Sequence, residues 1–424
     1  MGDFRPWDGK AAKRTMMSML LAGGLLAGPA QAQDGPGSGV SAWPSLSNDW
    51  FGHGPAMRAA GVDLQLKWRQ YYQAITRGAG DHDPAYGGQL SLKTTLDLSR
   101  MGFWDGFSIS AQALAKHGRG VNHLGGTLLP VNAGLFFPGR HGADRYDLSA
   151  LFVTQQMGDT ISLSIGKFYT VEMARGTPIR GGVGSDAFWH LQLSAPMNGM
   201  IPAQINGAVI AVATQPVSYT VMIFDPVDAT NKSLFKDLFD KGASIAATAT
   251  YATRLGGHDG YYSLTGIYST RDGADFSQLI VPAGTRIGQR DGGWLVGFSF
   301  QQYLHQDPVD PTRGWGVFGE LNIADGNPNP LDWSASLGVA GTDLIPGRRD
   351  DKLGIGVFHL ATSQTLKDEL APYYELGDEI GLEMFYTAAV TPWFHLTADL
   401  QYVDPAPGNL RSGVFVGIGS SVKF

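Results

Sequence analysis

Hydrophobic and polar positions alternate with a period of two along most of the chain. In "FHLTADLQY" (394 to 402), Phe394 and every second residue after it are apolar or aromatic, whereas His395 and every second residue after it are polar. This period places all apolar side chains of a segment on one face of a β-strand. Segments of about 10 residues that alternate in this way and are separated by turn residues are typical of a transmembrane β-barrel.

We count sixteen such segments from Val62 onward. Their predicted ranges are 62–73, 87–99, 105–117, 146–157, 159–169, 204–214, 217–226, 243–254, 260–270, 292–304, 313–324, 331–340, 351–361, 380–390, 394–403 and 412–424. In lipid every backbone N–H and C=O must be paired, which for strands requires a closed barrel. The sequence therefore predicts an all-β fold, a transmembrane antiparallel up-and-down β-barrel of 16 strands over residues 62–424.

The lengths of the connections support this count. If the N-terminus is periplasmic, connections after even-numbered strands should be short turns and those after odd-numbered strands longer external loops. The long connections 118–145, 170–203 and 362–379 all follow odd-numbered strands. Two connections depart from the rule, because the external 325–330 is short and the periplasmic 341–350 is rather long.

The N-terminus has the features of an export signal. A basic stretch precedes the short apolar run 15–30, and Ala30-Gln31-Ala32 fits the small-residue cleavage pattern. We expect residues 1–32 to be a secretory signal peptide that is removed. The alternative, a membrane anchor, is disfavoured because the run is short and contains Gly and Pro. Residues 33–61 are then a periplasmic leader, with a short helix predicted at 54–60.

Composition narrows the class of protein. Glycine accounts for 58 of 424 residues, about twice the usual share, which favours many strands and turns. Cysteine is absent, so neither disulfides nor thiol chemistry is expected. The formal net charge of −7 argues against nucleic acid as a partner.

The polar faces of the strands must look into the lumen, because an Arg or Lys facing lipid at mid-membrane costs about 2–4 kcal/mol. The inward charges then separate by sign. Basic residues come from the first two strands, and acidic residues from the eleventh, fourteenth and fifteenth; they are Lys67, Arg69 and Lys93, and Glu320, Glu383 and Asp399. Such separation predicts a transverse field that orients hydrogen-bonding solutes. The alternative is that these charges only solvate the lumen.

The connection 170–203 is the strongest candidate for a constriction. A connection of this length should have a function or be disordered. It contains Glu172, Arg175, Arg180 and Trp189, a mixture suited to a polar lumen. We expect it to fold inward and narrow the pore, alone or with 118–145. Arg and Glu could then bind sugar hydroxyls while Trp189 offers a flat apolar face.

Aromatic residues near the predicted strand ends suit the two membrane interfaces. The main candidates are Trp68, Trp315, Trp393 and the terminal Phe424. The alternative is ordinary core packing in a soluble sandwich. That reading would need a very large sheet, since one-sided strands recur sixteen times.

Enzyme and metal motifs are weak. Gly166-Lys167 lacks the first glycine of a phosphate-binding loop, and Ser185 lacks the glycines that flank a nucleophilic serine. His117 and His123 have no metal-ligand spacing on one element. We therefore expect neither a cofactor nor a metal, and no catalytic residues.

Three stretches resemble the carbohydrate-selective porins of the OprB family. "NDWFGHGPAMRAAGV" (48–62) resembles their entry motif, and "GLEMFYTAAVTPWFHLTADLQYVDPAPG" (381–408) their near-terminal hairpin. "SSVKF" is similar to their ending. The resemblance implies a sixteen-stranded pore of the Gram-negative outer membrane for passive uptake of glucose and other sugars. It also implies that the terminal aromatic is recognised by the outer-membrane assembly machinery.

The residues and the resemblance together predict a passive, carbohydrate-selective outer-membrane porin. The expected partners are small neutral sugars, outer-membrane lipid and the assembly machinery, with the protein a monomer or a homotrimer. One alternative is a general or anion-biased porin, because the inward bases could bind a carboxylate or phosphate. An outer-membrane barrel hydrolase is an alternative of another class.

Overall fold

The computed structural model describes residues 39–136, 145–173, 178–195, 200–234 and 236–424. Two sequence-based predictions fall elsewhere in the chain. The signal peptide at 1–32 and the pore-lining role of Arg175 lie outside the described residues. None of the helices among the described residues is long and apolar enough to cross a bilayer.

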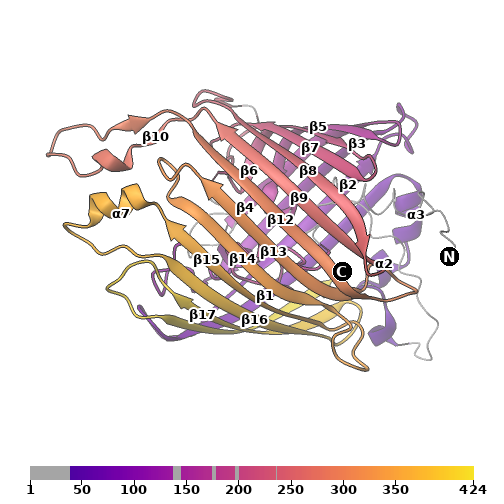
Figure 1. Cartoon of the computed structure of the whole chain (residues 1–424). Helices are drawn as coiled ribbons and strands as arrows, with labels where there is room; N and C mark the ends of the chain where they lie inside the picture. The colour runs from indigo at the N-terminus through magenta and orange to yellow at the C-terminus, as the bar shows by residue number, and fades with distance from the viewer. Residues whose placement is uncertain (1–38, 137–144, 174–177, 196–199, 235) are drawn as a thin grey trace, which may run out of the picture.

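Sixteen strands close into one antiparallel barrel, in which each strand pairs with its neighbours along the chain and β1 pairs with β18 (Figure 1). The barrel strands are β1 (Val62–Arg77), β2 (Ala85–Asp97), β3 (Phe107–Gly118), β4 (Arg145–Met157), β5 (Ile161–Tyr169), β6 (Gln204–Val212), β7 (Val217–Phe224), β8 (Ser244–Leu255), β9 (His258–Ser269), β12 (Gly293–Gln306), β13 (Gly314–Ala324), β14 (Leu331–Thr342), β15 (Lys352–Thr362), β16 (Glu379–Ala389), β17 (Phe394–Asp404) and β18 (Gly413–Lys423). The predicted fold class and strand number are confirmed.

The helices and the remaining strands lie in the connections and the leader. They are η1 (Val40–Ala42), α2 (Asn48–Phe51), α3 (Gly54–Ala59), α4 (Ala133–Phe136), α5 (Thr170–Met173), α6 (Leu191–Ser194), η3 (Phe276–Gln278), α7 (Gln364–Leu370), and the two-stranded sheet β10 (Gly273–Ala274) and β11 (Gln289–Arg290). The leader helix was predicted, whereas the small sheet was not. In Figure 1, β10 and α7 project from one end of the barrel, and α2 and α3 lie at the other. We assign the end with the short turns to the periplasm.

The seam between the first and last strands closes the sheet as the alternation predicts. Tyr72 of β1 lies opposite Ile418 of β18, and β1 continues to Arg77, beyond its predicted end, because Arg77 still pairs with Val414 across a bulge. On β18 Phe415 is fully buried and faces the lumen, whereas Ile418 is 56% exposed and faces outward. The apolar face of the strand therefore meets lipid.

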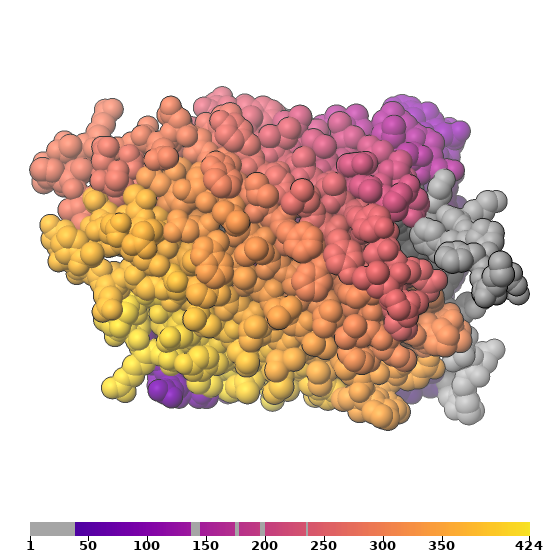
Figure 2. Space-filling model, viewed as in Figure 1, coloured from indigo at the N-terminus to yellow at the C-terminus, as the bar shows by residue number. Residues whose placement is uncertain are grey.

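The packed core of the protein lies inside the barrel. One buried cluster contains Phe318, Phe358 and Phe385 from the wall, and Phe188 and Leu193 from the connection between β5 and β6. The large exposed apolar side chains stand on the outer faces of the strands instead, as Leu264 and Leu337 do. Figure 2 shows one side of this outer surface as a continuous wall.

A strap formed by residues 40–61 ties the periplasmic end of the seam. Asn48, Asp49, Trp50 and Phe51 have φ between 50° and 59°, so they form a left-handed turn, a conformation that costs roughly 1–2 kcal/mol per residue. The turn aims the Trp50 indole N–H at the carbonyl of Leu64, 3.0 Å away. Nearby, the Leu46 N–H donates to the Lys423 carbonyl at 2.8 Å. These bonds satisfy backbone groups where β1 and β18 stop pairing.

The ion pair within this strap gives a testable pH dependence. Arg58 donates two hydrogen bonds to Asp49, at 2.6 and 2.9 Å, and these hold the pKa of Asp49 below its usual 3.8. A lowered folded-state pKa stabilises the folded state above the unfolded pKa, and the contribution is lost as the pH falls through the folded value. The unfolding temperature of the barrel in detergent should therefore decrease once the pH drops under 3.8, the ordinary pKa of an aspartate. The effect is small because the pair is partly exposed.

The control for this prediction is Asp49→Asn. The variant should lose part of the stability at neutral pH. Its unfolding temperature should decline less steeply in acid, because residue 49 no longer titrates, although some decline remains because other carboxylates do. Identical pH profiles for the two proteins would show that the strap does not contribute to stability through this pair.

Candidate solute pathway and constriction

The described parts of the connection between β5 and β6 fold into the lumen, as the sequence predicted. Phe188, Trp189 and Leu193 are at most 1% exposed, although they belong to a connection between strands. The Trp189 ring lies on the inner face of β18, against Gly417 and Gly419. A Cβ atom at either glycine would lie within 2.6 Å of the ring. The wall thus provides a flat surface on which this side chain can pack.

Glycines of β15 receive the same connection in the same way. A Cβ at Gly354 would lie 2.8 Å from the Phe188 ring, and one at Gly356 would lie 2.9 Å from a methyl group of Leu193. Such distances are shorter than packed carbon atoms tolerate. Part of the glycine excess therefore makes room for the inserted connection, whereas sequence analysis attributed it to strands and turns alone.

Ion pairs fasten the inserted connection to opposite walls. Lys93 of β2 lies 2.6 Å from Glu172, measured between Nζ and Oε2. Across the lumen, Arg180 lies 2.9 Å from Glu320 of β13. The connection thus carries an acidic group toward the basic wall and a basic group toward the acidic wall.

A third charged contact of the connection involves two wall strands. Asp186 is 3.3 Å from Lys67 of β1 and 3.5 Å from Lys352 of β15. Its carboxylate therefore lies between two ammonium groups from different strands. Lys352 was not singled out from the sequence, although the alternation along β15 places it on the inner face.

Buried carboxylates on the acidic wall hold the backbone of the connection. Glu383 accepts hydrogen bonds from the backbone N–H of Trp189 and from that of His190, the latter at 3.1 Å. The His190 ring stacks on Phe358 with 4.1 Å between centroids, and burial lowers the pKa of His190 to about 3, so the ring stays neutral. Asp399 accepts from Gln401 at 2.8 Å.

The described part of the connection between β3 and β4 also folds inward. Asn132 donates to the Gln73 side chain at 2.6 Å, and the Leu128 N–H donates to Glu379 at the same distance. The two connections bond to each other as well. The Ala133 N–H donates to the Trp189 carbonyl at 2.8 Å. In the opposite direction, the Leu191 N–H donates to the Pro130 carbonyl at 2.9 Å. Both connections therefore form one inserted unit.

The predicted pore-lining residues divide into accessible and covered groups. The side chains of Lys67 and Lys93 are 27% and 20% exposed, and that of Glu320 is 10% exposed. Arg69, which donates to Gln89 at 2.9 Å, is 2% exposed. Trp189 is an anchor of the connection in this structure, whereas we had expected an exposed face for a sugar ring. Its ring is covered by β18 and by Tyr71, edge-on at 5.1 Å.

The remaining members of the predicted set are covered too. Glu172 and Arg180 are about 5% exposed and face their ion-pair partners, and Glu383 and Asp399 are at most 4% exposed. The inserted connection meets three of the six inward wall charges, those of Lys67, Lys93 and Glu320, with a side chain of the opposite sign. This arrangement replaces a single field across an open lumen by a set of local ion pairs.

A cavity of about 290 Å³ lies between the connection and the wall. Its lining includes Arg180 and Asp186 from the connection, Thr342 and Lys352 from the wall strands, and Phe385 from β16. Thr342 and Lys352 lie where β14 and β15 meet their periplasmic turn. The cavity is therefore on the periplasmic side of the inserted unit.

The aromatic residues predicted at the interfaces have several surroundings. Trp315 is the first residue of β13 that faces outward. Trp393 lies in the periplasmic turn after β16, where its indole N–H donates to the Val40 carbonyl at 2.8 Å. The Phe424 N–H donates to Leu66 at 3.0 Å. Trp68 lies within β1 opposite Leu90, not at the strand end. It lines a hollow of about 460 Å³ on the outer wall, away from the lumen.

A closed sixteen-stranded barrel with apolar outer faces and a polar lumen narrowed by inserted connections defines an outer-membrane porin. A model of the family "Carbohydrate-selective porin, OprB family" matches residues 81–424, and the chain belongs to this family. It is thus a porin of the Gram-negative outer membrane. Fold and family point to a channel and not to an enzyme.

Individual relatives agree with this assignment. Porin B of Pseudomonas aeruginosa is 26% identical over 193 residues, which are 40% of this chain and 42% of that protein. The match therefore spans less than half the length of this curated relative. The high-pH structure of Pseudomonas putida OprB has a TM-score of 0.77 at 18% identity and covers 90% of this chain and 99% of that chain.

The low-pH structure of the same Pseudomonas putida protein is also similar. Its TM-score is 0.54 at 17% identity, with coverage of 90% of this chain and 98% of that chain. At these identities, both structural likenesses show the shared fold alone.

Proposed function

We propose that this porin lets small neutral sugars, such as glucose, diffuse passively into the periplasm along a route set by the inserted unit. The observation that carries the proposal is the attachment of one connection to both walls, through Lys93–Glu172 on one side and Arg180–Glu320 on the other. This attachment across the lumen supports a pathway that is narrowed by the inserted unit. No catalytic cycle is required.

The pairing of charges favours neutral, hydroxyl-rich solutes. An ion pair offers hydrogen-bond donors and acceptors side by side, but it attracts free ions less than an isolated charge does. A sugar can exchange its bonds to water for bonds to such groups. We assign solute contact to the partly exposed Lys67, Lys93 and Glu320, and support of the constriction to Arg69, Glu172, Arg180, Trp189, Glu383 and Asp399.

Liposome swelling with the purified protein tests this function. We expect glucose to enter faster than gluconate, a charged solute of similar size, because the ion-paired groups of the constriction attract a free carboxylate only weakly, while the carboxylate must give up part of its hydration to pass. The control is swelling with a general porin that has a wide lumen, for which the two rates should be similar. Equal rates through this protein would contradict carbohydrate selectivity.

An anion-biased porin is the second candidate, and one contact favours it. Lys67 and Lys352 both approach the single carboxylate of Asp186. Two cations beside one anion could attract a carboxylate or phosphate. Reversal potentials across a planar bilayer in a KCl gradient distinguish the candidates, since a strong preference for chloride would favour this second function.

The other proposed partners concern the membrane. The outward apolar faces of the strands contact outer-membrane lipid, and we propose that the assembly machinery recognises β18 with its terminal Phe424. The position of Phe424 at the periplasmic end of the seam supports this role. Whether one barrel or three form the working unit is open to measurement by native mass spectrometry.

A further inference from the structure

The cavity below the inserted unit has two unlike sides. Ile179, Ala187 and Phe385 give it an apolar side, and Asp186 and Lys352 a charged one. Its volume of about 290 Å³ lies just below the range of drug-sized ligand sites, which is about 300–1,000 Å³. A pyranose ring has the same division, because its C–H groups form apolar faces while its hydroxyls point outward around the rim.

The floor of the cavity is held in place by glycines of two neighbouring strands. Gly314 and Gly341 have φ of 143° and 142°, and a Cβ at Gly341 would lie 2.3 Å from the Gly314 carbonyl oxygen. The Thr342 hydroxyl accepts a hydrogen bond from the Gly314 N–H at 3.0 Å. A larger side chain at either glycine would displace the backbone that forms the floor.

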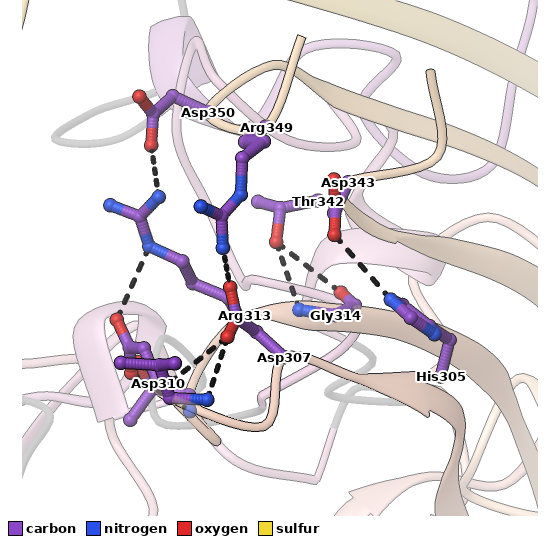
Figure 3. Close-up of polar contacts among 11 residues, drawn as sticks. His305, Asp307, Asp310, Arg313, Gly314, Thr342, Asp343, Arg349 and Asp350 are labelled. Carbon is purple, nitrogen blue, oxygen red and sulfur yellow. Dashed lines mark hydrogen bonds and ion pairs between the residues drawn. The ribbon is translucent and has the colours of Figure 1, made fainter. Parts of the chain in front are cut away.

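The periplasmic turns beneath this floor are tied together by ion pairs (Figure 3). Arg313 lies 3.2 Å from Asp310 in its own turn and 2.6 Å from Asp350 in the turn between β14 and β15. Arg349 in turn pairs with Asp307. These ion pairs connect the two turns, which favours a cavity that is formed before a solute arrives and so lowers the cost of binding.

The contact between Lys352 and Asp186 can open to admit a ligand. The distance of 3.5 Å between Nζ and Oδ2 exceeds the usual 2.7–3.2 Å of a strong hydrogen bond, roughly the range for N–H donors. The Lys352 side chain is also 36% exposed. A hydroxyl group placed between these two side chains could accept from the ammonium and donate to the carboxylate.

We propose that this cavity is a binding site for one neutral pyranose ring, and that Lys352 and Asp186 determine its specificity. The inference rests on the proposed function as a sugar porin. It adds a position on the periplasmic side of the constriction where a monosaccharide pauses during passage. The apolar ring face lies toward Ile179 and Phe385, and two adjacent hydroxyls bond to the charged pair.

Blocking of single-channel current by glucose tests the site. In planar bilayers the wild-type protein should show a saturable, glucose-dependent reduction of the ion current. Lys352→Met keeps most of the side-chain volume but removes the donor, so it should weaken the glucose block about tenfold. Lys241→Met, in the exposed connection between β7 and β8, removes the same charge elsewhere and should leave the block unchanged.

The size of the site gives a second readout. Maltotriose should block no more tightly than glucose, because only one ring fits the cavity. Unaltered glucose block in Lys352→Met, tighter block by maltotriose, or no block in the wild type would each overturn the inference. If swelling still favours glucose over gluconate, only this site is disproved; if swelling shows no such preference, the proposed function fails.

Discussion

Removal of residues 178–193, with the ends joined by a short Gly-Ser linker, is expected to raise the single-channel conductance severalfold while the barrel still assembles. These residues include the bulky side chains Phe188 and Trp189, which fill the lumen beside β15 and β18. The sixteen strands pair with one another without them. Conductance in planar bilayers and the electrophoretic shift of the heated protein measure the two effects.

A matched deletion distinguishes the constriction from a general effect of shortening a connection. Removing residues 275–288, between β10 and β11, shortens an external connection that projects beyond the barrel (Figure 1). This variant should keep the wild-type conductance. If the first deletion also left the conductance unchanged, the connection between β5 and β6 would have no part in narrowing the pore.

Trp189→Ala is expected to release the inserted connection from the wall. Truncating a fully buried tryptophan costs about 3–5 kcal/mol, and here the loss falls on the docking of the connection, because the ring packs on Gly417, Gly419 and Tyr71. Single-channel recordings should show larger and noisier currents. Limited proteolysis should cut the chain within 170–203.

The matched control is Trp393→Ala, which removes a tryptophan from a periplasmic turn outside the lumen. It should not change the current noise. Gly417→Val disrupts the same contact by changing the wall residue, since a Cβ there would lie 2.5 Å from the Trp189 ring. This variant should show the same current noise as Trp189→Ala. Quiet currents of wild-type size in both Trp189→Ala and Gly417→Val would contradict the anchoring role.

The strands could be predicted from the sequence because their signal is local. A strand that faces lipid on one side and a wet lumen on the other must alternate in hydrophobicity, and this alternation identified all sixteen barrel strands. The largest error, at the end of β1, has a tertiary cause. Residues beyond Gln73 remain in the strand because β18 continues to pair with them.

The site was harder to predict because its contacts join distant residues. Alternation correctly placed Lys67 and Lys93 on the lumen side, but it could not show that Asp186 and Glu172 would meet them, 119 and 79 residues away in the chain. Trp189 has the flat apolar ring of a sugar-binding side chain. Only its packing against the two glycines of β18 shows that it anchors the connection. Lys352 followed the inward pattern, yet its importance depends on the cavity beside it.

The sequence by itself determined the barrel, the number and direction of its strands and the face that meets lipid. It could do so because burial in a membrane imposes a period of two on neighbouring residues. The tertiary structure alone decided how two connections fold together inside the lumen, which charges they neutralise and where a cavity remains. Those outcomes depend on packing and ion pairs between segments that no local pattern relates.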